Sequence, residues 1–241
     1  MSIVARAELE SLLRARKLDM TLTTALARQP TGEGKAATGV PMLDEALDGG
    51  LRRGHLSEIV GARSTGRTTL MCAIVAAAIE RGEIAAIVDT HDRFDPADAA
   101  AAGIGLTRLL WIRDRGDASR ALKAMNLVLQ AGGFGVVVLD LADVRGIALR
   151  QFPATTWMRL SRVIEGSQTV ALLVAAERLA RSPGGVTIAL GAADGGDGVR
   201  WAGRSDRARL LDGLNLRPRV VMAHAAPARR DARRDIRRDT A

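Results

Sequence analysis

A glycine-rich stretch between two apolar runs carries the residue types that proteins use to hold a phosphate. Residues 61–69 read GARSTGRTT and match the pattern G-x-x-x-x-G-K-[ST], except that Arg67 stands in the lysine position. Glycine lets such a loop turn its N–H groups toward an anion, and the following helix adds its positive end. We therefore predict a nucleotide site formed by Gly61, Ser64, Thr65, Gly66, Arg67, Thr68 and Thr69. The alternative is a glycine-rich turn without a ligand.

The arginine changes what this loop can do. Arginine is planar and forked, so Arg67 can hold a phosphate in a bidentate grip, but it replaces a slimmer point charge. Thr68 offers a hydroxyl to Mg²⁺, and Asp140, which closes the apolar run from Val136, has the position of a Walker-B carboxylate. These residues predict ATP or ADP with magnesium, bound weakly, with Thr68 and Asp140 as the metal ligands.

Composition limits the class of protein. The 241 residues are 47% hydrophobic, which is enough to bury a core. No stretch of about twenty apolar residues occurs, so we expect no membrane helix and no signal peptide. The single cysteine, Cys72, allows no internal disulfide, and we expect a cytoplasmic protein.

The positive charge is concentrated near the end of the sequence. Residues 217–241 hold eight arginines and three aspartates, a surplus of +5 within the total of +8. Such a segment suits a phosphate backbone or an acidic protein surface, and a solvated tail is the equal alternative.

Three domains are predicted. Residues 1–35 form an amphipathic helical arm and linker, residues 36–225 an α/β core, and residues 226–241 a basic, disordered tail. Apolar runs separated by helical patterns indicate a mostly parallel sheet with helices on both faces. The expected strands are 56–60, 84–89, 109–113, 136–141 and 170–175, and the expected helices are 70–81, 96–102, 118–130 and 154–164. Runs at 186–190, 199–202 and 216–223, separated by glycine-rich stretches, predict antiparallel strands at the sheet edge.

The chain resembles the RecA family over residues 38–180. The resemblance lies in the segment TGVPMLDEALDGGL (38–51) that leads into the phosphate loop, in VDTHDRFDP (88–96) and in the strand GVVVLD (135–140). It implies a RecA-like core and assigns Asp95 to the adenine amino group. The chain departs from recombinases at Arg67, at His91, where the family has the glutamate that activates water, and at Asp98, where it has an aromatic. Loss of these groups implies weak or absent ATP hydrolysis.

In these departures the chain resembles the ImuA branch of the family. The resemblance implies an accessory protein of a bacterial mutasome in the SOS response to DNA damage. Its implied partners are an ImuB-like polymerase homologue and an error-prone replicative polymerase for translesion synthesis. Residues 1–30 are a candidate for self-association. The family's DNA loops correspond to residues 142–155 and 177–185, which implies contacts to single-stranded DNA by Arg145, Arg150, Arg178 and Arg181. A DNA-dependent ATPase or recombinase, and a scaffold with a vestigial loop, remain alternatives.

Overall fold

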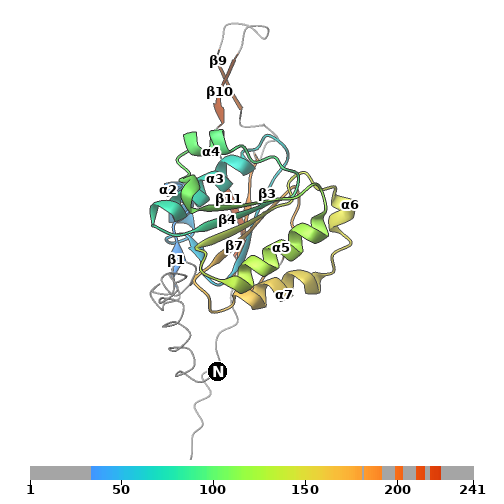
Figure 1. Cartoon of the computed structure of the whole chain (residues 1–241). Coiled ribbons are helices and arrows are strands. Elements are labelled where there is room, and N and C mark those ends of the chain that lie inside the picture. Colours follow the sequence, from blue (N-terminus) through green and yellow to red (C-terminus); the bar gives the residue numbers. More distant parts are fainter. Residues whose placement is uncertain (1–33, 181, 192–198, 203–209, 215–217, 224–241) are drawn as a thin grey trace, which may run out of the picture.

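Seven strands form one sheet through the centre of the protein. The computed structural model describes residues 34–180, 182–191, 199–202, 210–214 and 218–223. The strand order is β11-β8-β3-β7-β6-β4-β5, and all neighbours from β8 to β5 are parallel (Figure 1). The strands are β3 (Leu56–Val60), β4 (Ala85–Asp89), β5 (Leu109–Arg113), β6 (Val136–Asp140), β7 (Val170–Ala175), β8 (Val186–Ala189) and β11 (Arg219–Ala223). The predicted α/β fold with a mostly parallel sheet is confirmed.

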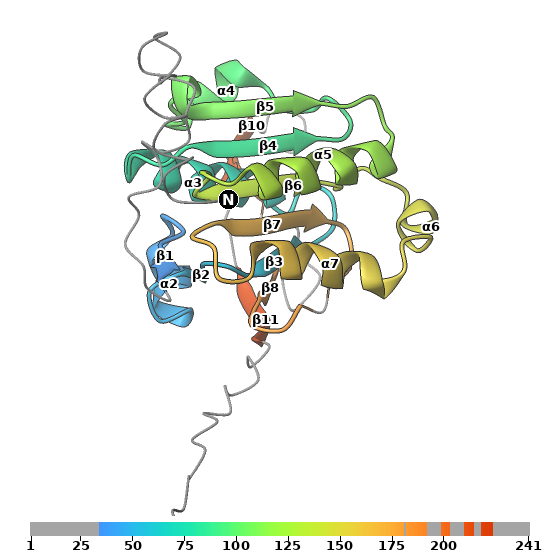
Figure 2. The ribbon, with the colours of Figure 1, turned by 60° about the horizontal axis from the view of Figure 1, so that its bottom comes forward.

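Helices cover both faces of this sheet because its central strands are apolar on both faces. Along β6, Val136 and Val138 belong to one core cluster, whereas Val137 and Leu139 belong to the other. The first cluster receives α3 (Arg67–Glu80), and the second receives α5 (Ala118–Ala131) and α7 (Ala154–Ile164). Figure 2 shows α5 and α7 side by side in front of the strands, which agrees with their mutual contacts. Because alternate side chains of a strand point to opposite faces, the sheet has a core on each side, and the domain has three layers: helices, sheet and helices.

Shorter elements complete the domain. The helices α2 (Pro41–Ala46) and α4 (Pro96–Ala101) contribute Leu43 and Ala99 to the same core cluster as α3. The remaining elements are β1 (Lys35–Ala36), which pairs with β2 (Leu51–Arg52), the 3₁₀ turn η3 (Leu106–Arg108), and α6 (Gly146–Leu149). Among the described residues, no helix is long and apolar enough to span a membrane.

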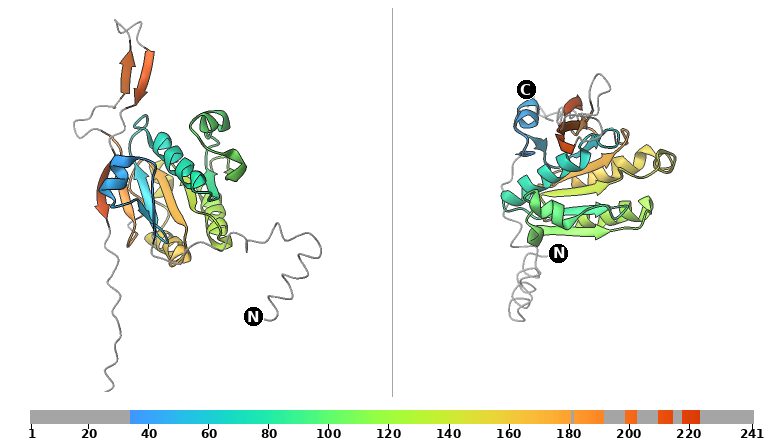
Figure 3. Two further views of the ribbon diagram at one scale, coloured as in Figure 1. Left: turned by 90° about the vertical axis from the view of Figure 1, so that its left-hand side faces the viewer. Right: turned by 90° about the horizontal axis from the view of Figure 1, so that it is seen from above.

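The predicted antiparallel strands need two corrections. β11 is antiparallel to β8 at the sheet edge, as predicted, but β8 itself runs parallel to β3. Gly184 and Gly185, just before β8, lie against His55 and Leu56 at the start of β3, so the chain has already crossed back and β8 runs in the direction of β3. β9 (Val199–Ala202) is not in the main sheet. It pairs with β10 (Leu210–Leu214) in a separate antiparallel hairpin that projects from the sheet in Figure 3.

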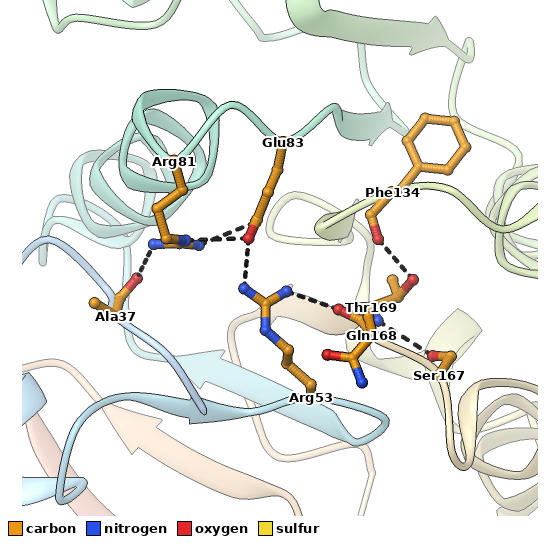
Figure 4. Close-up of polar contacts among 8 residues, drawn as sticks. All are labelled: Ala37, Arg53, Arg81, Glu83, Phe134, Ser167, Gln168 and Thr169. Carbon is orange, nitrogen blue, oxygen red and sulfur yellow. Dashed lines mark hydrogen bonds and ion pairs between the residues drawn. The ribbon is translucent and has the colours of Figure 1, made fainter. Parts of the chain in front are cut away.

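Charged and polar groups join the amino-terminal ends of the strands. Glu83, just before β4, accepts hydrogen bonds from Arg53 and from Arg81 (Figure 4). Arg53 also donates to the Gln168 carbonyl over 2.7 Å, and the side chains of Arg53 and Glu83 are only 11% and 9% exposed. This network fixes the segments that lead into β3, β4 and β7 relative to one another.

The two terminal predictions lie outside the described part of the chain. The predicted arm, residues 1–35, has only residues 34 and 35 within it, and the predicted tail, residues 226–241, has none. Both stay predictions.

Candidate functional site

The predicted phosphate loop joins the end of β3 to the start of α3. The N–H of Gly61 donates to the Ala175 carbonyl at the end of β7 over 3.3 Å. Within the loop, the Thr65 hydroxyl donates to the Ala62 carbonyl over 2.8 Å. A Cβ on Gly61 would lie 2.6 Å from that hydroxyl and 2.7 Å from the Leu190 carbonyl oxygen, so a side chain there would displace the loop. Gly66 has a φ of 92° and directly precedes the helix, a conformation that favours glycine.

The loop offers hydrogen-bond donors that the described protein does not use. In the described ranges, the N–H groups of residues 62–66 donate to no backbone or side-chain oxygen. Ser64 has a left-handed φ of 61°, which varies the direction of successive N–H groups as in an anion-binding nest. Thr68 and Thr69 are exposed in the first turn of α3. The seven predicted residues (61 and 64–69) therefore lie in one loop and helix start, together with a set of free donors.

Arg67 is buried and its guanidinium reaches the end of β6. The residue is only 7% exposed, and its Nη1 donates to the Ala142 carbonyl over 3.4 Å. Burial lowers the pKa of Arg67, while the charges of Asp140 and Asp143 raise it. An arginine stays protonated under any of these influences, so a fixed positive charge lies beside the two aspartates.

Asp140 ends β6, where the Walker-B pattern predicts it. One carboxylate oxygen, Oδ1, accepts from the Ala142 N–H over 2.8 Å, and the residue lies opposite Asp89 in the register of β4 and β6. Desolvation raises the pKa of Asp140 to about 6, and the charge of Asp89 adds to this effect. The Ala142 N–H and Arg67 act in the opposite direction. Asp89 is itself buried, and its Oδ2 accepts from the Phe94 N–H over 2.7 Å.

Asp143 forms ion pairs with two further arginines near the end of β6. Its carboxylate pairs with Arg63 of the loop at 2.9 Å and with Arg93 at 3.5 Å. Sequence reasoning missed Asp143, because it follows the strand as one of two nearby aspartates without a motif spacing of its own. The pair with Arg63 connects the phosphate loop directly to the segment after β6.

His91 and Asp95 follow β4. His91 is half-buried in the turn that follows the strand. Asp95 caps α4: its Oδ1 accepts from the N–H groups of Ala97 at 2.7 Å and Asp98 at 3.3 Å. The cap accounts for the position of this carboxylate, and its contact with adenine stays a prediction.

The two predicted DNA loops meet. Arg150, just after α6, pairs with Glu177, just after β7, at 3.7 Å, and both side chains are exposed. Arg145 and Arg178 are exposed on the same two loops. Arg181 lies outside the described residues. Three of the four predicted arginines thus lie on adjacent segments after β6 and β7.

Glu58 holds the second of these loops in place and was missed by sequence reasoning. It is 2% exposed in the middle of β3, and its Oε2 accepts from the N–H groups of Leu179 and Ala180 at 2.9 and 3.0 Å. Its Oε1 accepts from the Thr187 hydroxyl at 2.7 Å. A lone glutamate inside an apolar strand was the available signal, because a buried carboxylate needs partners.

Comparison with known proteins places the chain among RecA relatives. A family model described as the RecA N-terminal domain matches residues 25–147, just over half of the chain. Protein RecA of Borrelia hermsii is 35% identical over 118 residues, 48% of this chain and 33% of that protein. Protein RecA of Chlorobium limicola is 41% identical over 105 residues, 43% of this chain and 30% of that protein. Protein RecA of Deinococcus radiodurans is 40% identical over 105 residues, which are 43% of this chain and 29% of that protein. The matched region spans about a third of the length of these relatives.

Proposed function

Because this chain belongs to the RecA N-terminal domain family, we propose that it is a RecA-like accessory protein of a bacterial translesion DNA synthesis complex. In this proposal it binds an ImuB-like polymerase homologue, an error-prone replicative polymerase and single-stranded DNA. Its nucleotide site retains ATP or ADP weakly and hydrolyses ATP slowly or not at all. The residues that depart from the recombinase pattern support this choice within the family.

The observation that carries the proposal is the position of Arg67. The loop keeps its turns and its free N–H donors, so it retains the means to bind phosphate. The cation that should follow charge onto the outer phosphates is instead a buried guanidinium, which donates to the Ala142 carbonyl. With His91 in place of a carboxylate base, hydrolysis loses two supports at once.

Hydrolysis is tested on the purified chain by measuring phosphate release from ATP, with and without single-stranded DNA. We expect no release above that of an Asp140→Ala variant. Turnover that disappears in Asp140→Ala would instead support the alternative of a DNA-dependent ATPase.

DNA binding is proposed to be mainly electrostatic. Arg145, Arg150 and Arg178 are exposed, and the aromatic rings near them, Phe152 and Trp157, pack on each other at 6.1 Å between centroids. Since Trp157 is 5% exposed, it cannot serve as a stacking platform for bases. Affinity should therefore fall steeply as salt rises.

A substitution series measures this contribution. Arg178→Ala should reduce the slope of log affinity against log salt by about 0.7, the value for one phosphate contact on a single strand. Arg162→Ala, the same change at an exposed arginine of α7, should leave the slope unchanged. Binding that is equal at low and high salt would contradict the electrostatic interpretation.

Partner binding separates the accessory role from the scaffold alternative. Co-purification with the polymerase partners, using the full chain and a chain without residues 226–241, should recover a complex. If the chain binds neither polymerase partner nor DNA, the alternative of a scaffold with a vestigial loop would be favoured. Removing residues 1–30 and measuring mass by light scattering tests the proposed self-association.

A further inference from the structure

The end of β6 already holds a positive charge where the family pattern would place a metal ion. Asp140 and Thr68 are the predicted magnesium ligands, but Arg67 lies beside Asp140 and donates to the Ala142 carbonyl. Mg²⁺ requires near-octahedral oxygen ligands and loses water reluctantly. The Arg67 guanidinium opposes a divalent ion by like-charge repulsion at the Asp140 carboxylate itself, whereas the lysine of the family pattern reaches the outer phosphates. The residues present therefore do not fit magnesium.

The same residues fit an anion that carries no metal. The free N–H groups of residues 62–66 and the amino end of α3 supply partial positive charge on one side. Arg67 and Arg63 supply two full charges on the side of β6, and both already interact with Asp140 or Asp143. A guanidinium presents several N–H donors in a plane that matches two phosphate oxygens.

We propose that this phosphate loop binds the diphosphate of a nucleotide without magnesium, with the Arg67 guanidinium in the place of the metal. The inference rests on the nucleotide site proposed above and specifies its ligand as the metal-free form. Arg67 is then a residue that determines specificity, because it selects the free nucleotide over its magnesium complex.

Calorimetric titration of ADP into the purified full chain tests this, once in EDTA and once in millimolar magnesium. The wild-type protein should bind ADP at least as tightly in EDTA as in magnesium. Arg67→Lys restores the side chain of the family pattern, so magnesium should now tighten ADP binding by about tenfold, which corresponds to ~1.4 kcal/mol. Arg108→Lys is the matched control: Arg108 also donates Nη1 to a backbone carbonyl, that of Gly82, at 2.8 Å, but lies before β5. It should behave as the wild type.

Pyrophosphate provides a second probe, because it contains the phosphates without the base. It should compete with ADP in EDTA. Thermal unfolding of Arg67→Lys, followed by circular dichroism, shows whether the variant is folded; a folded variant with unchanged metal dependence overturns the inference.

Three other results also overturn it: ADP binding that requires magnesium in the wild type, no ADP binding in either buffer, or no competition by pyrophosphate. Failure of the accessory role is a separate outcome, since it is measured by partner and DNA binding. A chain that binds its partners but needs magnesium for ADP would refute this inference alone.

Discussion

The segments before β3, β4 and β7 and the loop after β3 differ in how their polar groups are paired. At the amino-terminal end of the sheet, Glu83 is paired with Arg53 and Arg81, and the Thr169 hydroxyl donates to the Phe134 carbonyl over 2.7 Å (Figure 4). At the carboxyl-terminal end, the N–H groups of residues 62–66 have no acceptor among the residues described, and Thr68 is exposed. The segments that lead into β3, β4 and β7 thus form a closed network, whereas the loop that follows β3 offers an open set of donors.

This difference distinguishes polar groups that stabilise the fold from polar groups that are available to bind a ligand. Groups that satisfy one another stabilise the domain, because removing one partner leaves a buried charge or donor without compensation. Groups without partners contribute little to stability and remain available to an anion. Substitutions in the network and in the loop should therefore have unequal effects on unfolding.

The largest effect is expected in the closed network. Glu83→Ala should lower the free energy of unfolding by about 3 kcal/mol, because it leaves the little-exposed guanidinium of Arg53 without its carboxylate. Urea denaturation measures this. Glu80→Ala, at the exposed end of α3, is the control and should change stability by less than about 0.5 kcal/mol. Equal effects of the two variants would remove the distinction between the network and the loop.

Glu58→Gln should rank second, with a loss of about 2 kcal/mol. In the glutamine, the oxygen still accepts from Leu179 and Ala180, and the NH₂ faces the Thr187 hydroxyl, which can turn to accept. The loss arises because charge-assisted hydrogen bonds of a carboxylate become weaker neutral ones. Urea denaturation gives the loss, and hydrogen exchange at the Leu179 and Ala180 amides should become faster. Glu45→Gln, at an exposed position of α2, should leave both measurements unchanged. Undiminished protection of the two amides would show that Glu58 does not fix this loop.

A smaller effect depends on pH. Arg120 holds the pKa of Asp114 down at about 2, with help from the N–H groups of Asp117 and Arg115. A carboxyl whose pKa is lower in the folded state stabilises the protein above its unfolded value and loses that contribution as the pH falls. The advantage of the wild type over Asp114→Asn should thus be about 1 kcal/mol at neutral pH, discounted for the exposure of Arg120, and should vanish between about pH 4 and pH 2.

Urea denaturation across this pH range tests the assignment. Arg120→Gln removes the partner rather than the carboxyl and should lose the same pH-dependent increment. Stability curves for wild type and Asp114→Asn that stay parallel down to about pH 2 would contradict the assigned cause.

The smallest effect is expected beside the open set of donors. Thr68→Val should change the free energy of unfolding by less than about 0.5 kcal/mol, because its exposed hydroxyl has no hydrogen-bond partner in the described ranges. Urea denaturation again provides the measurement. A loss above about 1 kcal/mol would mean that this hydroxyl is part of the structure rather than available to a ligand.

The sequence predicts the central strands well because their apolar runs have no competing interpretation. It places the start of α3 at Leu70, three residues late, since the glycine-rich pattern gives no sign that the helix begins directly after Gly66. It misses β10, where Asp212 and Gly213 interrupt the apolar run. The direction of β8 could not be read from a glycine-rich loop, because direction depends on which strand the segment pairs with.

The site is predictable only where a motif has fixed spacing. The loop residues and Asp140 follow from such spacing and lie at the carboxyl ends of β3 and β6, between which the sheet has only β7. Asp143 and Glu58 act through partners 80 and more than 120 residues away, so no local pattern reveals them. The orientation of Arg67 toward β6 likewise depends on tertiary structure.

The pairing of β3 has a consequence for the order in which the protein can assemble on the ribosome. β3 lies between β7 and β8, so residues 56–60 find their neighbours only in residues 171–175 and 187–189. A nascent chain that has emerged as far as α6 contains the whole nucleotide loop but no strand to support it. The loop should therefore become rigid late in synthesis, after most of the domain has left the exit tunnel. A fragment limited to residues 25–147, the extent of the family match, would lack both supporting strands.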